Sequence, residues 1–428
     1  MKESLTWGDI SSGDFSLRYS PKGYFFSDVG NSLFVYDDDK KWYILAFGNT
    51  KLFNQMTKLL NQTMHFKPGN MLKMPLIYDE KHKKEIDDIA RDNIRLAKLD
   101  WDAFETSWDF AYHPLLRKVS DMENAFEQWK VECEERFNQV KINEEELNRI
   151  FIDIYGVKNE LTSEIGEKNN SVRKADLSRD IRSFILYAIG CIFGRYSLDE
   201  EGLIYAGGEW NSSKYETFLP DNDNCIPITD EEYFSDDIVS RFIEFVKTVY
   251  GADTLEENLD FIANALGNKG DTSREVIRNY FLKDFYADHL KVYQKRPIYW
   301  LFDSGKQNGF KALIYMHRYD ADTVGRVRTD YLHRAQKYVE TAMQSAQYTI
   351  DNASSASEKS KATKAVTKYT KQLAEMKIYD EAIAHIANQR IEIDLDDGVK
   401  VNYAKFQGVE VAQEGKKALK VDLLAKLK

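Results

Sequence analysis

Basic side chains gather in one part of the chain, between Lys291 and Lys337, which we call the basic block. Lysine and arginine donate charge-assisted hydrogen bonds to phosphate, and arginine can also bridge two acceptors on a guanine edge. The basic residues of this span are Lys291, Lys295, Arg296, Lys306, Lys311, Arg318, Arg326, Arg328, Arg334 and Lys337, and its acids are Asp303, Asp320, Asp322 and Asp330. Although the formal net charge of the chain is -11, this span predicts a local surface for an anion such as nucleic acid.

A second candidate group lies near the N-terminus. Arg18 has the donors to bridge a guanine, and Asn31 has the amide to bridge an adenine. Phosphate groups could be neutralised by the lysines of this segment, which are Lys22, Lys51, Lys58, Lys67 and Lys73. Each residue has an ordinary alternative role, in a turn, an ion pair or a solvated surface. The residues that we predict to contact DNA are Arg18, Lys22, Asn31, Lys67, Lys73, Lys311, Arg318, Arg326, Arg328 and Arg334.

The sequence lacks the motifs that would carry catalysis. A DNA amino-methyltransferase needs an Asn/Asp-Pro-Pro-aromatic loop to hold the target amino group, and the chain has no Pro-Pro pair. It also has no Gly-x-Gly pattern for a cofactor turn and no phosphate-binding Gly-x-x-x-x-Gly-Lys-Ser/Thr loop. His317 and His333 lack a second ligand at metal-binding spacing. We therefore expect no catalytic residue, no metal and no cofactor in this chain.

Composition indicates a globular protein. Hydrophobic residues make up 43% of the sequence and aromatic residues 13%, which is enough for real cores. No apolar run is long enough to span a membrane, and the N-terminus does not look like a signal peptide, so we expect a cytoplasmic protein without a membrane partner. Cys133, Cys191 and Cys225 are widely spaced and odd in number, which predicts buried, reduced thiols.

The hydrophobic periodicity predicts an α+β fold that is predominantly helical. We expect a small mixed α/β segment over residues 1–80, a helical domain over 81–290, and a last part over 291–428. That last part should hold the basic block as strand and helix, then a long helical pair and a C-terminal β-hairpin.

Some elements have sharper signals in the first two parts. Arg18 to Phe34 alternates aromatic runs with glycine and proline, which predicts short strands and tight turns. Trp42 to Leu60 carries apolar residues at near-helical intervals and predicts one helix. Asp176 should cap a helix that ends near Gly194.

The C-terminal part has its own signals. Ile298–Phe302 and Phe310–Met316 read as short strands, and Asp322 should start a long helix that residues 352–360 interrupt. From 391 to 403, apolar residues alternate with polar ones around Asp396-Asp397-Gly398, which predicts the hairpin. Its acids, Glu392, Asp394 and Asp396, would then be solvated rather than catalytic.

Several long stretches resemble the C-terminal half of the PglX family, the adenine-specific DNA methyltransferases of BREX phage-exclusion systems. A looser similarity connects them to type IIG restriction-modification enzymes. These stretches are Lys295–Tyr319, Thr106–Phe110, Asn143–Thr162, Asp180–Ser197, Pro227–Phe242 and Leu255–Gly267. Arg18–Phe34 and Asn61–Pro75 are similar to the target-recognition region of that family, so the resemblance makes residues 1–80 the end of a target-recognition domain.

The resemblance implies a DNA target-recognition and assembly portion of a site-specific adenine (N6) methyltransferase that acts in phage defence. The catalytic domain is missing, so the chain is expected to be a fragment or a split gene product. S-adenosylmethionine is implied for the full-length enzyme only. The implied partners are double-stranded DNA and the methyltransferase half or other BREX components.

Two alternatives stay open. The chain could be a protein-interaction scaffold that modulates a methyltransferase without binding DNA, or the specificity module of a type IIG enzyme. Duplex binding that weakens steeply with salt would favour the first interpretation over the scaffold, because neutralising phosphates releases counterions.

Overall fold

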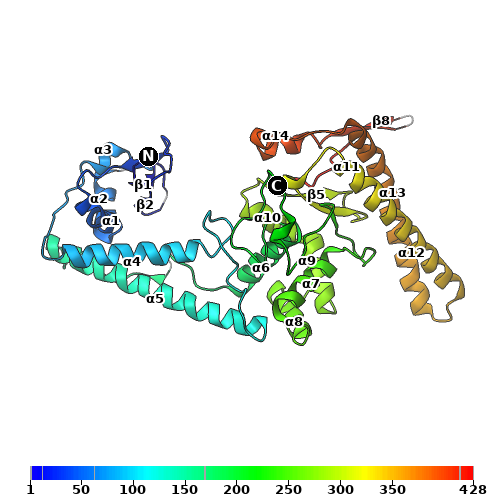
Figure 1. Ribbon diagram of the computed structural model, residues 1–428, viewed down its shortest axis with the longest axis horizontal. Coiled ribbons are helices and arrows are strands. Elements are labelled where there is room, and N and C mark those ends of the chain that lie inside the picture. The colour runs from blue at the N-terminus through cyan, green and yellow to red at the C-terminus, as the bar shows by residue number, and fades with distance from the viewer. Residues whose placement is uncertain (1, 12, 62, 168–169, 414–415, 428) are drawn as a thin grey trace. The chain divides into compact units, whose positions relative to one another are not determined.

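The computed structural model describes residues 2–427 except 12, 62, 168–169 and 414–415. The chain divides into two compact units, one made of residues 1–102 and 128–175, the other of residues 103–127 and 176–428 (Figure 1). The fold is α+β and predominantly helical, as the sequence predicts. Among the described residues, no helix combines the length and apolar character that a membrane crossing requires.

The first unit places a small antiparallel sheet on helices. The sheet has the order β2-β1-β3, and Leu5 on the central strand pairs with both Tyr19 and Leu33. Its strands and the elements after them are β1 Ser4–Gly8, β2 Arg18–Ser20, β3 Gly30–Leu33, η1 Asp38–Lys40, α1 Lys41–Gly48, α2 Lys51–Leu60, α3 Pro68–Met71 and α4 Lys83–Trp101, followed by part of α5 Met122–Tyr155. The predicted strands between Arg18 and Phe34 are confirmed.

Two helices stand where the sequence predicts one from Trp42 to Leu60. Thr50 has an extended backbone, and its hydroxyl accepts from the backbone N–H of Phe53, so it caps α2 and separates it from α1. Both helices bury aromatic side chains, and Phe47 and Phe53 lie edge to face with ring centroids 5.2 Å apart. The extra break lets two short helices cover one small core.

Helices dominate the first part of the second unit. Asp176 caps α6 by accepting from the Arg179 N–H, and Gly194 follows the helix with φ of 75°, as predicted. The helices here are α6 Leu177–Ile192, α7 Ile238–Tyr250, α8 Leu255–Leu266, α9 Ser273–Lys283 and α10 Phe285–Val292, with a short turn at η3 Ser212–Lys214. The cysteine side chains of both units are buried, also as predicted: Cys133 in the first unit, and Cys191 and Cys225 in the second.

The basic block supplies two of the three strands of a sheet in the second unit. The strands of this sheet are β4 Ile226–Pro227, β5 Tyr299–Asp303 and β6 Lys311–Tyr315, in the order β4-β6-β5 and all antiparallel. Helical structure then runs through η4 Met316–Arg318, α11 Thr323–Arg326, the π-helical turn η5 Val327–Leu332 and α12 His333–Asn352, and returns along α13 Ala356–Gln389. The two strands, the long helix and the helical pair are therefore confirmed, and α12 and α13 lie side by side (Figure 1).

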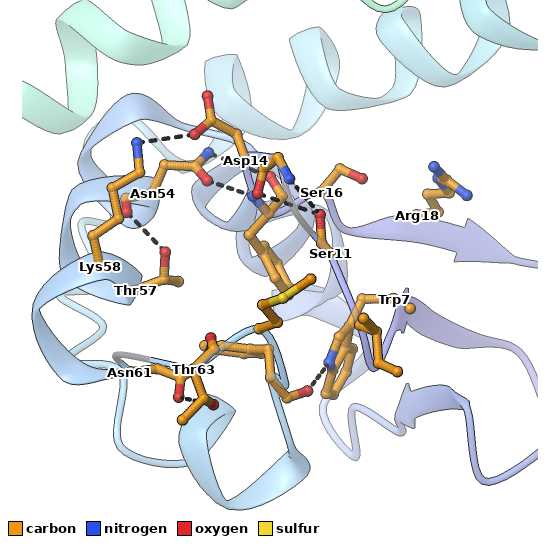
Figure 2. A pocket seen from close by; sticks show the side chains of 16 residues that line it. Trp7, Ser11, Asp14, Ser16, Arg18, Asn54, Thr57, Lys58, Asn61 and Thr63 are labelled. Carbon is orange, nitrogen blue, oxygen red and sulfur yellow. Dashed lines mark hydrogen bonds and ion pairs between the residues drawn. The ribbon is translucent and has the colours of Figure 1, made fainter.

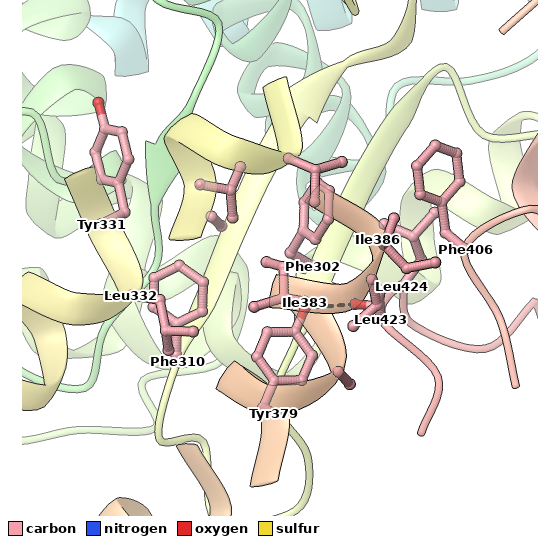
Figure 3. Packing of buried hydrophobic residues seen from close by; sticks show 14 of the residues in the cluster. Phe302, Phe310, Tyr331, Leu332, Tyr379, Ile383, Ile386, Phe406, Leu423 and Leu424 are labelled. Atoms are coloured by element: carbon pink, nitrogen blue, oxygen red, sulfur yellow. Dashed lines mark hydrogen bonds between the residues drawn. The ribbon is translucent and has the colours of Figure 1, made fainter. Parts of the chain in front are cut away.

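A buried cluster joins the sheet to α13 and to the C-terminal residues. Phe302 and Phe310 from the strand region pack with Tyr379 and Ile383 of α13, and the Tyr379 hydroxyl donates to the Leu423 carbonyl at 2.6 Å (Figure 3). Residues far apart in sequence thus share one hydrophobic core.

The predicted hairpin over residues 391–403 is wrong. The chain instead forms a short turn, η6 Leu395–Asp397, and a helix, α14 Val399–Ala404. Asn402, Tyr403 and Phe406 are buried at helical spacing, and Tyr403 packs edge to face on Trp300 with centroids 5.5 Å apart. A β-hairpin does form further on, from β7 Val409–Gln413 and β8 Lys416–Val421. Packing against Trp300 therefore outweighed the alternating pattern.

Candidate nucleic-acid interface

The loop between β2 and β3 carries exposed aromatic side chains beside basic ones. Tyr24, Phe25 and Phe26 are 53%, 87% and 57% exposed, and Lys22 is exposed next to them. The Phe26 ring lies against Phe34 with centroids 5.6 Å apart. Three consecutive exposed aromatic side chains concentrate apolar surface in one place, and contiguous apolar surface of this kind marks interaction sites.

Arg18 is the best placed of the predicted base-reading residues. It lies on the edge strand β2, where its backbone pairs with Thr6 of β1, and its side chain is exposed. Within the described residues, its guanidinium forms no ion pair. All of its donors are therefore available to a ligand.

A pocket of about 360 Å³ opens beside Arg18 in the same unit. Trp7, Phe15 and Phe66 supply aromatic surface, and hydroxyl and amide side chains supply hydrogen-bonding groups. Those polar residues are Ser11, Ser16, Asn54, Thr57, Asn61 and Thr63. Aromatic faces with nearby amides and hydroxyls suit a nucleobase or a base edge, which needs stacking and directional hydrogen bonds together.

Internal contacts already engage part of this pocket. Asn54 accepts from the Phe15 N–H at 2.7 Å, and Lys58 pairs with Asp14 at 2.9 Å. In Figure 2, Lys58 and Asp14 face each other on one side, while Arg18 lies on the other side, away from them. Arg18 thus adds to the lining of this pocket a positive charge that forms no ion pair among the described residues.

The other lysines of the first unit that are candidates for DNA contact differ in whether they already have a partner. Lys22 and Lys73 are exposed, and neither forms an ion pair with a described residue. Lys67 is exposed but lies 2.7 Å from Asp9, whose pKa is held below its usual range by hydrogen bonds from Lys67 and His65. Lys51, by contrast, donates to the Glu164 carbonyl.

Asn31 lies inside the unit. Its side chain is buried on β3, and its amide donates to the Phe66 carbonyl at 3.3 Å, the same carbonyl that accepts from the Trp7 indole at 2.7 Å. Contact with a base would require Asn31 to leave this hydrogen bond, so the structure does not bring it to the surface beside Arg18.

Two residues of the basic block point into the second unit. Arg318 donates to the carbonyls of Asp221 and Asn222 at 2.7 and 3.0 Å, and its guanidinium lies 4.5 Å from the centre of the Trp210 ring. The Lys311 ammonium is buried and donates to the Leu282 carbonyl at 3.1 Å. These contacts join the basic block to α9 and to the loop at Asp221 and Asn222, and they leave few donors for DNA.

The arginines of the long helix differ in exposure. Arg326 lies 2.8 Å from Asp320, and Arg328 donates to Asp380 of α13 at 2.8 Å. Arg334 is exposed, with its guanidinium 5.3 Å from the Phe234 ring and a long contact of 3.4 Å to the Tyr338 hydroxyl. Of the three, Arg334 keeps the most capacity for an external anion.

Among the described residues, no three His, Cys, Asp or Glu side chains gather so as to hold a metal ion. His333 instead lies 2.9 Å from Asp380, and burial lowers the pKa of His317 to about 4. His333 therefore takes part in an ion pair, and His317 is held neutral by burial.

The exposed aromatics of the β2–β3 loop were missed in the sequence. Their signal was the run Tyr24-Phe25-Phe26 between two glycines, where no alternation assigns one side to a core. Only the structure shows that the loop has no cover over Phe25 within the described residues.

Comparison with known proteins relates this chain to two adenine-specific methyltransferases. No family model matches it. It is 48% identical over 415 residues to the adenine-specific methyltransferase PglX of Lacticaseibacillus casei (strain Zhang), covering 95% of this chain and 34% of that protein. It is 36% identical over 436 residues to the adenine-specific methyltransferase BrxX of Escherichia coli O9:H4 (strain HS), covering 95% of this chain and 36% of that protein. The chain spans about a third of the length of these relatives, and over nearly all of its own length it is a homologue of a segment of the PglX and BrxX methyltransferases.

Proposed function

We propose that this chain is the DNA target-recognition and assembly portion of a PglX-like, site-specific adenine (N6) methyltransferase that acts in phage defence. The main support is that 95% of the chain is similar to about a third of two adenine-specific methyltransferases. In addition, the sequence has no Pro-Pro-aromatic loop. Methyl transfer, and the S-adenosylmethionine that it consumes, would then belong to a segment outside this chain. The catalytic segment and other BREX components are the proposed protein partners.

The first unit is the proposed reader of DNA. Arg18 would contact a base edge beside the aromatic pocket, while Lys22 and Lys73 would hold phosphates. The exposed ring of Phe25 would pack against sugars or insert at a base step, as apolar side chains do in DNA grooves. Arg334 of the second unit is a further proposed phosphate contact.

The scaffold alternative draws on a different observation. Four members of the basic block that could have faced DNA, Lys311, Arg318, Arg326 and Arg328, each have partners inside the second unit. A second unit held together by these side chains would serve protein contacts as well as DNA contacts. Duplex binding separates the two functions.

The test is fluorescence polarisation of labelled DNA duplexes with the full chain across a salt series. We expect affinity to fall linearly on a log-log plot against salt, because phosphate neutralisation releases counterions. Lys22→Ala and Lys73→Ala should each weaken binding to all sequences and reduce the slope by about one. Arg18→Ala should cost about 1–3 kcal/mol on the preferred duplex and relax the preference at one base pair, which selection from a randomised duplex pool would reveal.

The matched control is Lys361→Ala, which removes one positive charge from the exposed face of α13. It should leave both affinity and slope near those of the unmodified chain. Absence of salt-dependent duplex binding, together with capture of a PglX catalytic segment, would favour the scaffold. Methyl transfer to adenine by the purified chain alone would contradict the proposed division of labour.

A further inference from the structure

A second pocket, of about 490 Å³, opens in the second unit between α9, α10, β5 and the C-terminal residues. None of it belongs to the proposed reader in the first unit. Its basic lining residues are Lys283, Lys291, Lys295, Lys311 and Lys426, and its acidic lining residue is Asp303. A concave site with this excess of ammonium groups attracts anions, because its walls concentrate the field of the charges.

The pocket also has an apolar floor. Phe281, Tyr286, Leu290 and Leu301 line it, and all four are buried in the unit. A purely ionic surface patch would have no such floor. The combination of apolar rings with a cationic rim matches a ligand that has a flat apolar body and a negatively charged group.

Lys311 already has partners inside the pocket wall. The Lys311 ammonium donates to the Leu282 carbonyl at 3.1 Å and lies 3.7 Å from the Asp303 carboxylate. Burial raises the pKa of Asp303, while the charge of Lys311 opposes that rise. This pair therefore forms part of the wall and leaves the remaining lysines as the source of positive charge.

Lys291 and Lys295 are the free cations of the rim. Both are exposed, and neither has a carboxylate partner among the described residues. Lys283 donates to the Asn279 amide oxygen at 2.9 Å, and Lys426 lies 3.7 Å from Asp422. Lys291 and Lys295 can therefore both turn to an incoming anion without breaking an ion pair.

The backbone is held in a costly conformation where these lysines sit. Gln294 and Lys295 have φ of 50° and 60°, in the left-handed region that side chains with a Cβ rarely adopt. The Lys295 N–H donates to the Leu290 carbonyl at 2.7 Å and ends α10. This hydrogen bond closes a common type of helix C-terminal cap, so the turn holds the Lys295 backbone at the edge of the pocket.

We propose that this pocket binds a phosphate group carried by a flat, apolar body, the chemistry of a nucleotide. The phosphate lies between Lys291 and Lys295, and the base or an equivalent ring packs on the floor around Tyr286 and Leu301. Two sources have this chemistry, a free nucleoside phosphate and a nucleotide of bound DNA. The free nucleotide fits better, because the pocket has a floor for one ring.

Isothermal titration of the full chain tests this site with AMP, adenosine, inorganic phosphate and a DNA duplex as separate probes. We expect AMP to bind, and adenosine and phosphate to bind more weakly, since each lacks one half of the ligand. The Lys291→Ala/Lys295→Ala variant should lose at least about tenfold in AMP affinity, because charge-assisted hydrogen bonds are the strong class. Lys291→Arg/Lys295→Arg should retain most of it.

The control removes the same charge elsewhere, with Lys361→Ala/Lys364→Ala on the exposed face of α13. It should leave AMP affinity unchanged, and circular dichroism should show every variant folded. If AMP does not bind but the pocket variant alone loses duplex affinity, DNA is the source of the phosphate and the site stands. If the pocket variant changes neither AMP nor duplex binding relative to the control, the site is refuted.

Discussion

Arg328 of the π-helical turn and Asp380 of α13 form an ion pair between two elements that are 52 residues apart in sequence. Arg328 Nε lies 2.8 Å from Asp380 Oδ1, and Nη2 lies 3.3 Å from Oδ2. His333 Nε2 lies 2.9 Å from the same Oδ1. Burial would raise the pKa of Asp380, but hydrogen bonds from Arg328 and His333 hold it below its usual range.

Arg328→Ala should therefore destabilise the second unit. We expect a loss of about 1–3 kcal/mol in the free energy of unfolding, because a partly buried carboxylate loses its main donor. Arg328→Lys should lose less, since it keeps the charge but not the two-point geometry. Denaturant titration measures both variants. The stabilisation should be present at neutral pH and lost as the pH falls through the lowered pKa of Asp380. If Arg328→Ala leaves the free energy of unfolding unchanged, the ion pair does not stabilise the second unit.

The ion pair between Arg278 and Asp237 should stabilise the second unit more than the pair between Arg328 and Asp380. Arg278 donates to both oxygens of Asp237 at 2.8 and 2.9 Å, and the Asp237 side chain is fully buried. Arg278→Ala leaves an unpaired buried carboxylate and should cost about 3–5 kcal/mol. Arg274 on the same helix pairs with the exposed Glu256, so Arg274→Ala should cost about 0–1 kcal/mol. Equal losses in the two variants would show that burial does not set the difference.

Glu105 should make stability depend on pH. Burial raises its pKa to about 7, against the opposing charge of Arg195 and a hydrogen bond from Tyr293 at 2.8 Å. Between about pH 4.5 and 7, the folded state keeps a proton that the unfolded state releases, so stability falls as pH rises. Relative to Glu105→Gln, the unmodified chain should lose about 3 kcal/mol across this window. Thermal unfolding at a series of pH values measures the difference.

The control for Glu105 is an exposed glutamate. Glu381 lies on the exposed face of α13, and Glu381→Gln should leave the pH profile of stability unchanged. A parallel profile for the unmodified chain and Glu105→Gln would mean that the Glu105 carboxyl is not protonated at pH 6 in the folded state.

Two helical glycines should respond to alanine with opposite signs. A Cβ at Gly190 would lie 2.4 Å from Cδ2 of Tyr196, so Gly190→Ala should destabilise by about 1–3 kcal/mol through overpacking. A Cβ at Gly325 would meet no described atom within 4 Å, so Gly325→Ala should stabilise by about 0.5–1 kcal/mol. Denaturant titrations of the two variants give the signs. The same sign at both positions would contradict the packing at Gly190.

Phe25→Ala should separate binding from folding. The side chain is 87% exposed, so its removal should change the free energy of unfolding by less than about 0.5 kcal/mol. If Phe25 contacts DNA as proposed, duplex affinity should fall while the salt slope stays unchanged, because no charge is lost. Phe53→Ala, in the buried core of the same unit, should instead destabilise it by about 3–5 kcal/mol. Unchanged duplex affinity in Phe25→Ala would remove this residue from the proposed interface.

The sequence by itself determined the elements whose signals are local. The cap at Asp176, the strands on either side of Gly305, the break after Asn352 and the return of the chain along α13 all follow from neighbouring residues. The resemblance of its long stretches also sufficed to identify the relatives.

Only the tertiary structure decided which basic side chains are exposed and which have partners inside the protein. Arg18 and Arg318 are the same residue type, yet the side chain of Arg18 is exposed and that of Arg318 donates to carbonyls of a distant loop. Residues Val399–Ala404 form a helix whose Tyr403 packs on Trp300, about 100 residues away in sequence. Burial and partners arise from long-range packing, and no local pattern records which distant residue arrives.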